Sequence, residues 1–302
     1  MDFTLFNEEL KTLCPEMKLC RDEPMSAHTS FRIGGPAAVM AFPQNAAQLG
    51  QLLKFSKEKN IPVRILGAGT NVLAPDEGMQ ELVVCLKDAM DGMELLEGDR
   101  IRVAAGVTMA RAAVFAANNG LTGMEFAHGI PGTVGGGVYM NAGAYGGELG
   151  MICESVDVVT EQGELKTLSN AEMGFSYRHS ILEEQFAVVT GVVLQLQPGD
   201  PEEIRGKMQE LMEKRKTSQP LDKPSAGSAF KRPVGGYAAA LIDQAGLKGF
   251  RIGGAAVSTK HAGFVVNMGG ATAADVKKLL QEVARSVKDH SGITIEPEVR
   301  IW

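Results

Sequence analysis

Cysteine is scarce in this sequence and is not arranged for disulfides or for metal binding. The four cysteines (Cys14, Cys20, Cys85 and Cys153) are widely spaced and form no CxxC pair. The five histidines lie far apart, and no HExxH motif occurs. We therefore expect no metal site and expect reduced thiols, with a structural role favoured over a reactive one for Cys20 and Cys153.

Long apolar runs and basic runs are missing as well. No stretch approaches the roughly 20 apolar residues that a membrane span requires, and the N-terminal residues mix acids, lysine and proline, unlike a signal peptide. A net charge of −6 without a Lys/Arg run argues against nucleic acid as a partner. With 302 residues, 44% of them hydrophobic, we expect a soluble cytoplasmic protein of two or three domains, with no obligate protein partner evident.

The common nucleotide motifs are also absent. The nearest approach to G-x-G-x-x-G is Gly67–Val72, in which Val72 stands where the third glycine belongs. Neither a Walker A motif nor a G-x-S-x-G nucleophile elbow occurs. The 36 glycines nevertheless gather in clusters, the longest within 129–147. Glycine lets backbone approach a ligand closely, so the clusters indicate either a large phosphate-bearing ligand held by several loops, or simple turns.

Hydrophobic periodicity and capping residues predict an α+β protein in three pieces. Helices are expected at 1–20, from Asn45 to about 59, at 108–119, from the residues after 201 to about 216, at 237–244 and at 273–288. Strands are expected at 39–42, 63–66, 82–86, 101–105, 156–160, 164–168, 186–196, 264–267 and 293–302. Gln162-Gly163 is a plausible hairpin turn, and Pro198–Pro201 the best linker candidate.

Three glycine-rich segments together suggest a cradle for a diphosphate: Thr29–Pro36, Ile65–Leu73 and Gly129–Gly147. A pocket without strong positive charge must hold a diphosphate mostly through backbone N–H groups, which a concave run of residues supplies as an anion nest. Residues 67–71 can form such a nest, and the Pro131-Gly132 loop can add N–H groups from the other side. Each loop alone would more often be a turn; their joint occurrence is more specific.

These loops resemble the FAD-binding domain of the vanillyl-alcohol oxidase and p-cresol methylhydroxylase superfamily. The fuller pattern, from Thr29 to Trp302, resembles the UDP-N-acetylenolpyruvoylglucosamine reductase family, in its shorter type II form. Ala68 and Gly263 depart from the common family residues, Gly and Asn. The resemblance implies non-covalent FAD, NADPH as reductant, and reduction of UDP-N-acetylglucosamine enolpyruvate to UDP-N-acetylmuramate in peptidoglycan precursor synthesis. No covalent flavin link to His28 is implied.

The same resemblance implies the domain limits. They are an N-terminal helical segment at 1–28, a two-part FAD-binding domain at 29–197 (about 29–90 and 91–197), and a smaller substrate-binding domain at 203–302.

The resemblance also implies the roles of individual residues. Arg178 would face the substrate carboxylate as negative charge develops, Ser228 would give a proton to C2, and Glu298 would join the group that stabilises the enolate. For the flavin, the family match implies Gly67, Ala68, Gly69, Thr70, Asn71, Val72, Pro131, Gly132, Thr133, Val134, Asn141, Ala142, Gly143 and Arg300. For the UDP substrate it implies Tyr139, Tyr145, Lys231 and Arg232.

Two alternatives remain open at the level of sequence. One is another enzyme on the same flavin scaffold, such as a sugar-acid or lactone oxidase, because one fold hosts many reactions. The other is a non-enzymatic nucleotide-binding or scaffold protein that keeps the loops without the chemistry. The segments around Ser228 and Glu298 lie outside the flavin part and favour the reductase.

Overall fold

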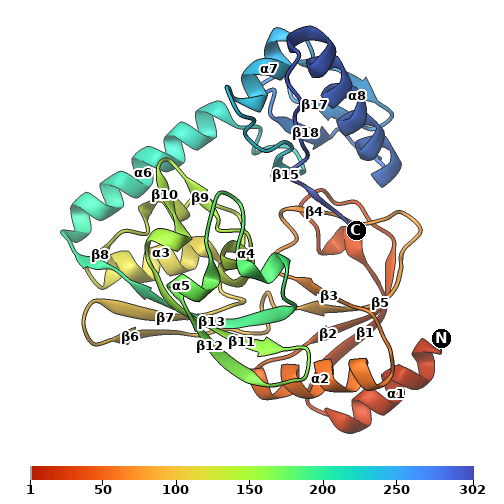
Figure 1. The fold of residues 1–302 in the computed structure, drawn as a ribbon, viewed down its shortest axis with the longest axis vertical. Helices are drawn as coiled ribbons and strands as arrows, with labels where there is room; N and C mark the ends of the chain where they lie inside the picture. The colour runs from red at the N-terminus through yellow and green to blue at the C-terminus, as the bar shows by residue number, and fades with distance from the viewer. Residues whose placement is uncertain (1) are drawn as a thin grey trace. The chain divides into compact units, whose positions relative to one another are not determined.

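The computed structural model describes residues 2–302, which form two compact units (Figure 1). Unit 1 consists of the residues up to Asp22 together with Ala38–Ala68 and Glu81–Glu213, and unit 2 of Glu23–Ala37, Gly69–Gln80 and Lys214–Trp302. Helices and strands are mixed in both, which confirms the α+β class. The domain limits drawn from the sequence describe ligand-binding parts and stay a prediction.

Unit 1 holds most of a four-stranded sheet in the order β1-β2-β5-β3. Its strands are β1 (Lys18–Pro24), β2 (Pro36–Phe42), β3 (Val63–Leu66) and β5 (Met79–Cys85). The helix predicted over 1–20 is wrong beyond α1 (Phe3–Leu13), because Pro15 disfavours helical backbone at Cys14. Strand β1 then begins at Lys18.

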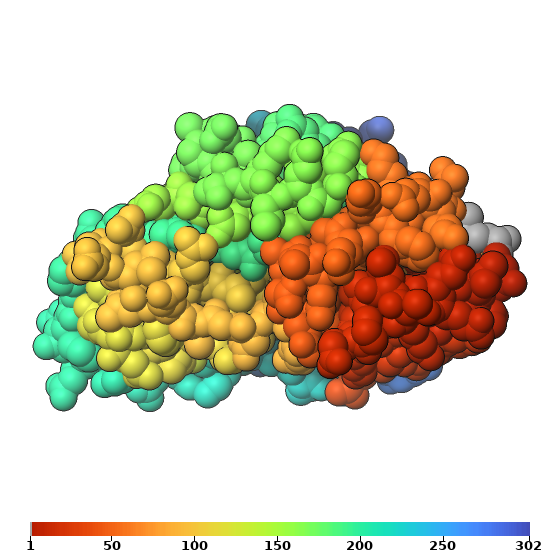
Figure 2. Space-filling view, turned by 90° about the horizontal axis from the view of Figure 1, so that it is seen from below, coloured from red at the N-terminus to blue at the C-terminus, as the bar shows by residue number. Residues whose placement is uncertain are grey.

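Helices α1 and α2 (Ala46–Glu58) lie side by side, in red and orange at the foot of Figure 1. The rings of Phe6 and Phe55 stack with centroids 5.4 Å apart. In the space-filling view of Figure 2, these N-terminal segments lie next to each other on the surface, in red and orange. Asn45 is the predicted N-cap of α2 and accepts a hydrogen bond from the N–H of Gln48 at 2.9 Å, which confirms this helix start.

The second sheet of unit 1 is antiparallel and five-stranded, in the order β12-β11-β13-β7-β6. Its strands are β6 (Met93–Leu96), β7 (Arg100–Ala104), β11 (Cys153–Thr160), β12 (Leu165–Ser169) and β13 (Ala187–Gln195). Helix α3 (Met109–Asn118) buries small residues in the core, including Ala112 and Ala116. The predicted hairpin turn is confirmed, since β11 pairs with β12 and Gly163 has φ +82°.

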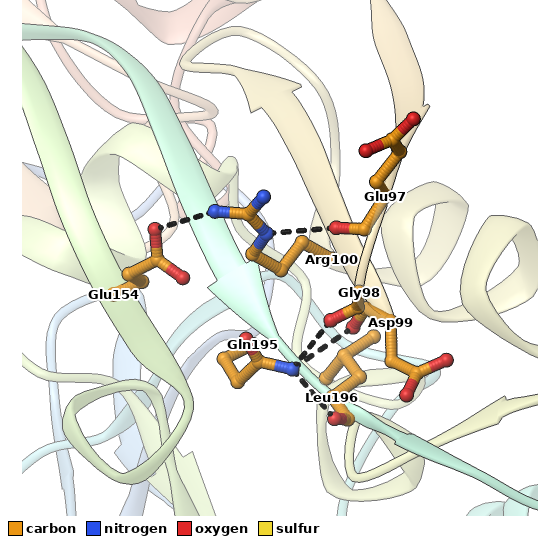
Figure 3. A network of polar contacts seen from close by, with 7 residues as sticks. All are labelled: Glu97, Gly98, Asp99, Arg100, Glu154, Gln195 and Leu196. Atoms are coloured by element: carbon orange, nitrogen blue, oxygen red, sulfur yellow. Dashed lines mark hydrogen bonds and ion pairs between the residues drawn. The ribbon is translucent and has the colours of Figure 1, made fainter.

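Polar contacts connect the turn between β6 and β7 with strands β11 and β13 (Figure 3). The side-chain amide of Gln195 donates to the carbonyls of Gly98 at 2.9 Å and Leu196 at 3.2 Å. Arg100 donates to the carbonyl of Glu97 at 2.9 Å and to Glu154 at 3.2 Å. Strand β6 was not predicted, because its residues Met-Glu-Leu-Leu include no β-branched or aromatic residue.

Residues 197–200 are not a free linker, contrary to prediction. Strand β14 (Gln197–Pro198) pairs with β8 (Leu121–Thr122), and Asp200 accepts from the N–H of Glu202 at 2.7 Å. The cap starts α6 (Pro201–Ser218), where proline is compatible with the first helical position.

Unit 2 has its own core beneath an antiparallel sheet of order β15-β18-β17-β16. The strands are β15 (Ser225–Ser228), β16 (Arg251–Ile252), β17 (Ala255–Val257) and β18 (Phe264–Asn267), and the helices are α7 (Ala238–Gln244) and α8 (Ala273–Ser291). The buried face of α8 carries Val276, Leu280, Val283 and Val287, spaced three or four residues apart.

The strand predicted over 293–302 is wrong except for β19 (Arg300–Ile301), which pairs in parallel with β4 (Val72–Leu73). Pro297 has no N–H for a strand ladder and makes only an isolated bridge with Phe230.

The remaining elements are short. They are α4 (Val134–Tyr139), α5 (Asn170–Met173), β9 (Gly143–Ala144), β10 (Gly147–Glu148), and the 3-10 turns η1 (Met25–Ala27), η2 (Glu125–Ala127), η3 (Leu149–Met151) and η4 (Ile181–Glu183).

Asp275 at the start of α8 generates a test of pH-dependent stability. Its carboxylate accepts from the N–H groups of Gly254 (3.0 Å) and Thr272 (3.2 Å). These hydrogen bonds, the one from Gly254 foremost, hold the pKa of Asp275 below its ordinary value. Because the folded pKa lies below the unfolded one, this contribution is present above the unfolded pKa and is lost as the pH falls through the folded pKa.

We expect Asp275→Asn to lower the free energy of unfolding by up to about 1 kcal/mol near neutral pH, because Asp275 completes the capping box whose N-cap is Thr272. The difference should shrink below about pH 4, where carboxylates protonate. Urea unfolding at neutral and acidic pH measures both. Asp289→Asn, at an exposed position near the end of the same helix, is the control; an equal loss there would contradict the role of the cap.

Candidate active site

The loop after β3 contains two glycines that no other residue can replace without strain. A Cβ on Gly67 would stand 2.5 Å from Oγ1 of Thr133. Gly69 has φ +62°, and a Cβ there would stand 2.0 Å from the carbonyl oxygen of His28. The backbone of this loop therefore lies closer to its neighbours than a side chain allows.

The N–H groups of this loop form the donor set that a diphosphate needs. Those of Ala68, Gly69 and Thr70 donate to no acceptor within residues 2–302. The carbonyl of Gly69, by contrast, accepts from the N–H of Ser30 at 3.0 Å and from its hydroxyl at 3.3 Å. Successive N–H groups without a protein acceptor fit an anion such as the diphosphate of FAD.

The loop before α4 has fewer N–H groups available for a ligand than we predicted from the sequence. The N–H of Gly132 donates to the carbonyl of Ile130 at 2.9 Å, and that of Val134 to Val107 at 2.8 Å. The hydroxyl of Thr133 caps α4 by accepting from Gly136. The N–H groups of Gly132 and Val134 are thus used inside the protein, and the cofactor role of residues 131–134 stays a prediction.

Two tyrosines lie close together in the chain here, Tyr139 as the last residue of α4 and Tyr145 on the tight turn that follows. Strands β9 and β10 are joined by Tyr145 and Gly146, which have φ +54° and +88°, as in a two-residue type I′ hairpin. The side chain of Tyr145 is 47% exposed and that of Tyr139 is 38% exposed. Both are accessible to a ligand, while their binding of substrate stays a prediction.

Arg178 lies on a two-residue turn that closes at Ser176 and His179. The N–H of each of these residues donates to the carbonyl of the other at 3.2 Å. Arg178 itself has φ +56°, a left-handed backbone that costs an arginine of order 1 kcal/mol. Non-glycine residues in such backbone gather at functional sites when the surroundings hold them there.

The guanidinium of Arg178 has a defined place within unit 1. Its Nη2 donates to the carbonyl of Gly143 at 2.9 Å, and its Nη1 lies 3.5 Å from that of Asn141. The ring of Tyr177 lies 5.0 Å from the guanidinium carbon. The planar fork is therefore oriented by backbone carbonyls, and such a fork suits a carboxylate.

Ser228 is exposed at the end of β15, next to an irregularity in the sheet. The register of β15 against β18 shifts between Ser225 and Ser228, and Gly227 has φ +74°. Ala226 and Ala229 on either side are buried in the core of unit 2. The bulge thus turns the hydroxyl of Ser228 outward while its neighbours anchor the strand.

The structure brings Glu298 beside this strand. The N–H of Glu298 donates to the carbonyl of Ala229 at 2.9 Å, one residue after Ser228. The carbonyl of Glu298 accepts from the side-chain amide of Asn71 at 3.1 Å. Within unit 2, Glu298 is therefore hydrogen-bonded to the residue after Ser228 and to Asn71, a predicted flavin residue.

Ser30 is a further link that sequence analysis did not assign. Its hydroxyl donates to the carbonyl of Ser225 at 2.6 Å and lies 3.3 Å from that of Gly69. Ser30 therefore connects the start of β15 with the loop after β3. Its place inside the Thr29–Pro36 motif was a signal that this residue has a specific function.

Tyr237 was also missed as a partner of the predicted substrate residues. The guanidinium carbon of Arg232 lies 4.0 Å from the centre of the Tyr237 ring, across an exposed glycine-containing loop. This contact orients Arg232. The binding of the UDP phosphates by Lys231 and Arg232 stays a prediction. An arginine and an aromatic residue flanking a glycine loop was the available signal.

Cys85 and Cys153 are both buried thiols. Burial raises the pKa of Cys85 to about 11 and that of Cys153 to about 12, so neither is a thiolate at neutral pH. Within residues 2–302, no three His, Cys, Asp or Glu side chains gather as a metal site would need. Nor does any helix in that range have the length and apolarity to cross a membrane.

Comparison with known proteins agrees with this geometry. The model of an FAD binding domain matches residues 36–169, which defines the chain as a flavin-binding protein. The model of the UDP-N-acetylenolpyruvoylglucosamine reductase C-terminal domain matches residues 219–302. The chain belongs to the UDP-N-acetylenolpyruvoylglucosamine reductase family.

Individual relatives cover almost the full length. A UDP-N-acetylenolpyruvoylglucosamine reductase from Caldanaerobacter subterraneus is 47% identical over 97% of both chains, and one from Streptococcus pneumoniae strain JJA is 46% identical over 92% of both. The crystal structure of the enzyme from Thermus caldophilus is 35% identical, with a TM-score of 0.78 over 95% of this chain and 99% of that one. Alkyldihydroxyacetonephosphate synthase, 16% identical with a TM-score of 0.50, shares the fold alone over 66% of this chain and 41% of its own.

The glycine geometry gives a direct test of the FAD site. We expect Gly69→Ala to weaken FAD binding more than about tenfold, because a left-handed alanine costs about 1–2 kcal/mol before its clash with His28. Fluorescence titration of the apoprotein with FAD measures the change. Gly206→Ala in α6 is the matched control, since a Cβ there meets nothing within 4 Å. FAD affinity that is unchanged in Gly69→Ala would remove this loop from the site.

Proposed function

We propose that this chain reduces UDP-N-acetylglucosamine enolpyruvate to UDP-N-acetylmuramate, with NADPH as the reductant and bound FAD as the hydride carrier. The observation that carries the proposal is identity of 46–47% over nearly the whole chain to enzymes of this name. The cradle at residues 67–70 and the hydrogen-bonded group around Ser228 and Glu298 support it. The reaction would take place in the cytoplasm, as a step of peptidoglycan precursor synthesis.

When bound, FAD supplies the hydride that reaches C3 of the enolpyruvyl group. As that bond forms, negative charge develops on C2 and spreads into the substrate carboxylate. We assign Arg178 to this carboxylate, because a guanidinium oriented by the carbonyls of Asn141 and Gly143 can form two parallel hydrogen bonds to it. Preorganised charge of this kind stabilises the transition state without reorganisation.

Ser228 completes the reduction by giving its hydroxyl proton to C2, so that the double bond gains one hydride and one proton. A serine hydroxyl is a weak acid, and this transfer is possible because the carbanion at C2 is strongly basic. Glu298 joins the stabilising group as a protonated carboxyl or through a water molecule. The bond from Glu298 N–H to the carbonyl of Ala229 supports placing both groups at one substrate atom.

The binding roles follow the same proposal. Residues 67–72, 131–134, 141–143 and Arg300 would hold FAD, with the N–H groups of Ala68, Gly69 and Thr70 on the diphosphate. Tyr139, Tyr145, Lys231 and Arg232 would bind the UDP sugar. The partners of the chain are then small molecules, namely NADPH and the UDP substrate.

The substrate requirement tests the proposal as a whole. The purified protein should show the visible absorbance of a flavin, and should consume NADPH only when UDP-N-acetylglucosamine enolpyruvate is added under nitrogen. Spectrophotometry of NADPH loss, with product identified by mass, is the measurement. Oxygen consumption with a sugar acid or lactone, and no NADPH loss with the enolpyruvyl sugar, would favour an oxidase. A protein that stays colourless after addition of FAD would favour a scaffold role.

The role of Ser228 has its own test. Ser228→Ala should retain FAD and its reduction by NADPH, yet lose about 10²- to 10⁴-fold in turnover, the usual contribution of general acid catalysis. Stopped-flow measurement of the two half-reactions separates these steps. Ser225→Ala, on the same strand, should keep turnover close to the parent protein. Near-normal turnover of Ser228→Ala would eliminate this serine as the acid.

A further inference from the structure

Asn141 is fully buried and has a strained backbone, and its side-chain amide is hydrogen-bonded at both the nitrogen and the oxygen. Its side chain is 0% exposed, and its φ is +44°. The amide nitrogen donates to the carbonyl of Ser176 at 2.9 Å, and the amide oxygen accepts from the N–H of Gly150 at 2.8 Å. Both ends of the amide thus bond to protein backbone.

The bond to Ser176 falls on the turn that carries Arg178. Ser176 is one end of that turn, and the backbone carbonyl of Asn141 lies 3.5 Å from Nη1 of Arg178. The other end is held by Ser180, whose buried hydroxyl donates to the carbonyl of Tyr139 at 2.6 Å. The turn is therefore fastened to residues 139–143 at both ends and through the guanidinium itself.

We propose that Asn141 is a positioning residue for Arg178: its amide holds the 176–179 turn against residues 141–143, so that the guanidinium points in one direction. This inference rests on the proposed function, in which Arg178 binds the substrate carboxylate. Left-handed backbone at Arg178 persists only when its surroundings hold it, and the Asn141 bond to Ser176 is one such restraint. A displacement of about 1 Å in such a group costs up to about 100-fold in rate.

The chemistry of the side chain explains why asparagine occupies this position. An amide offers one donor group and one acceptor, as the carbonyl of Ser176 and the N–H of Gly150 require. An aspartate keeps the size and the acceptor for Gly150, but turns an oxygen toward the carbonyl of Ser176. A glycine tolerates the positive φ and removes both bonds.

The test uses Asn141→Asp, with Asn141→Gly as a second variant that keeps the backbone unstrained. FAD affinity and the rate of reduction by NADPH are measured in both variants, because residue 141 also stands among the residues proposed to hold FAD. Reduction of the enolpyruvyl substrate in the second half-reaction should slow by about 10- to 100-fold. Asn170→Asp is the matched control: the side chain of Asn170 donates to the carbonyls of Gly150 (2.8 Å) and Cys153 (2.7 Å), and neither of these residues belongs to the turn. It should keep the parent rate.

A double-mutant cycle separates positioning from general structural damage. If Asn141 acts through Arg178, then Asn141→Asp should change the second half-reaction less than about twofold in an Arg178→Ala background. An equal loss in both backgrounds would overturn the inference, as would a parent-like rate in Asn141→Asp and Asn141→Gly. Loss of FAD affinity in these variants alone would overturn it too and assign Asn141 to the cofactor.

The cycle also distinguishes failure of the inference from failure of the proposed function. An Arg178→Ala variant that reduces the enolpyruvyl substrate at the parent rate removes Arg178 from the mechanism, and the inference with it. A slow Arg178→Ala variant together with a fast Asn141→Asp variant overturns the inference and leaves the proposed function standing.

Discussion

The close packing of backbone at the loop after β3 is the constraint on which the rest of the structure depends. Gly67 and Gly69 have no room for a Cβ, and the N–H groups of residues 68–70 have no acceptor within residues 2–302. Such a loop binds an anion through dipoles rather than through lysine or arginine. An acidic protein can therefore hold a diphosphate without a basic patch.

Hydrogen bonds to and from the backbone hold the residues assigned to catalysis in place. Arg178 is oriented by the carbonyls of residues 141 and 143, and Glu298 is fixed through its own N–H and carbonyl. Positive φ at Arg178 stores local strain that the surrounding hydrogen bonds offset. Preorganisation of this kind places groups before substrate arrives, which is what transition-state stabilisation requires.

Local signals predicted the elements whose ends are determined by neighbouring residues. Asn45 caps α2 as expected, and Val63–Leu66 and Phe264–Asn267 are strands with the predicted limits. Prediction failed where proline or pairing decided the outcome. Pro15 ended α1 early, Pro297 prevented a long C-terminal strand, and the supposed linker at 198–201 was paired and capped. Such pairing depends on residues far away in the chain and leaves no local signal.

The amino-acid sequence by itself determined the α+β class, the flavin-type glycine loops and the family, because turn glycines, caps and motif order are local properties of the chain. The tertiary structure alone decided that Ser30 joins β15 to the diphosphate loop, that Asn71 bonds to Glu298, and that Asn141 bonds to the turn of Arg178. These contacts join residues 35 to 227 positions apart, so they exist only once the chain has folded and no spacing rule reports them.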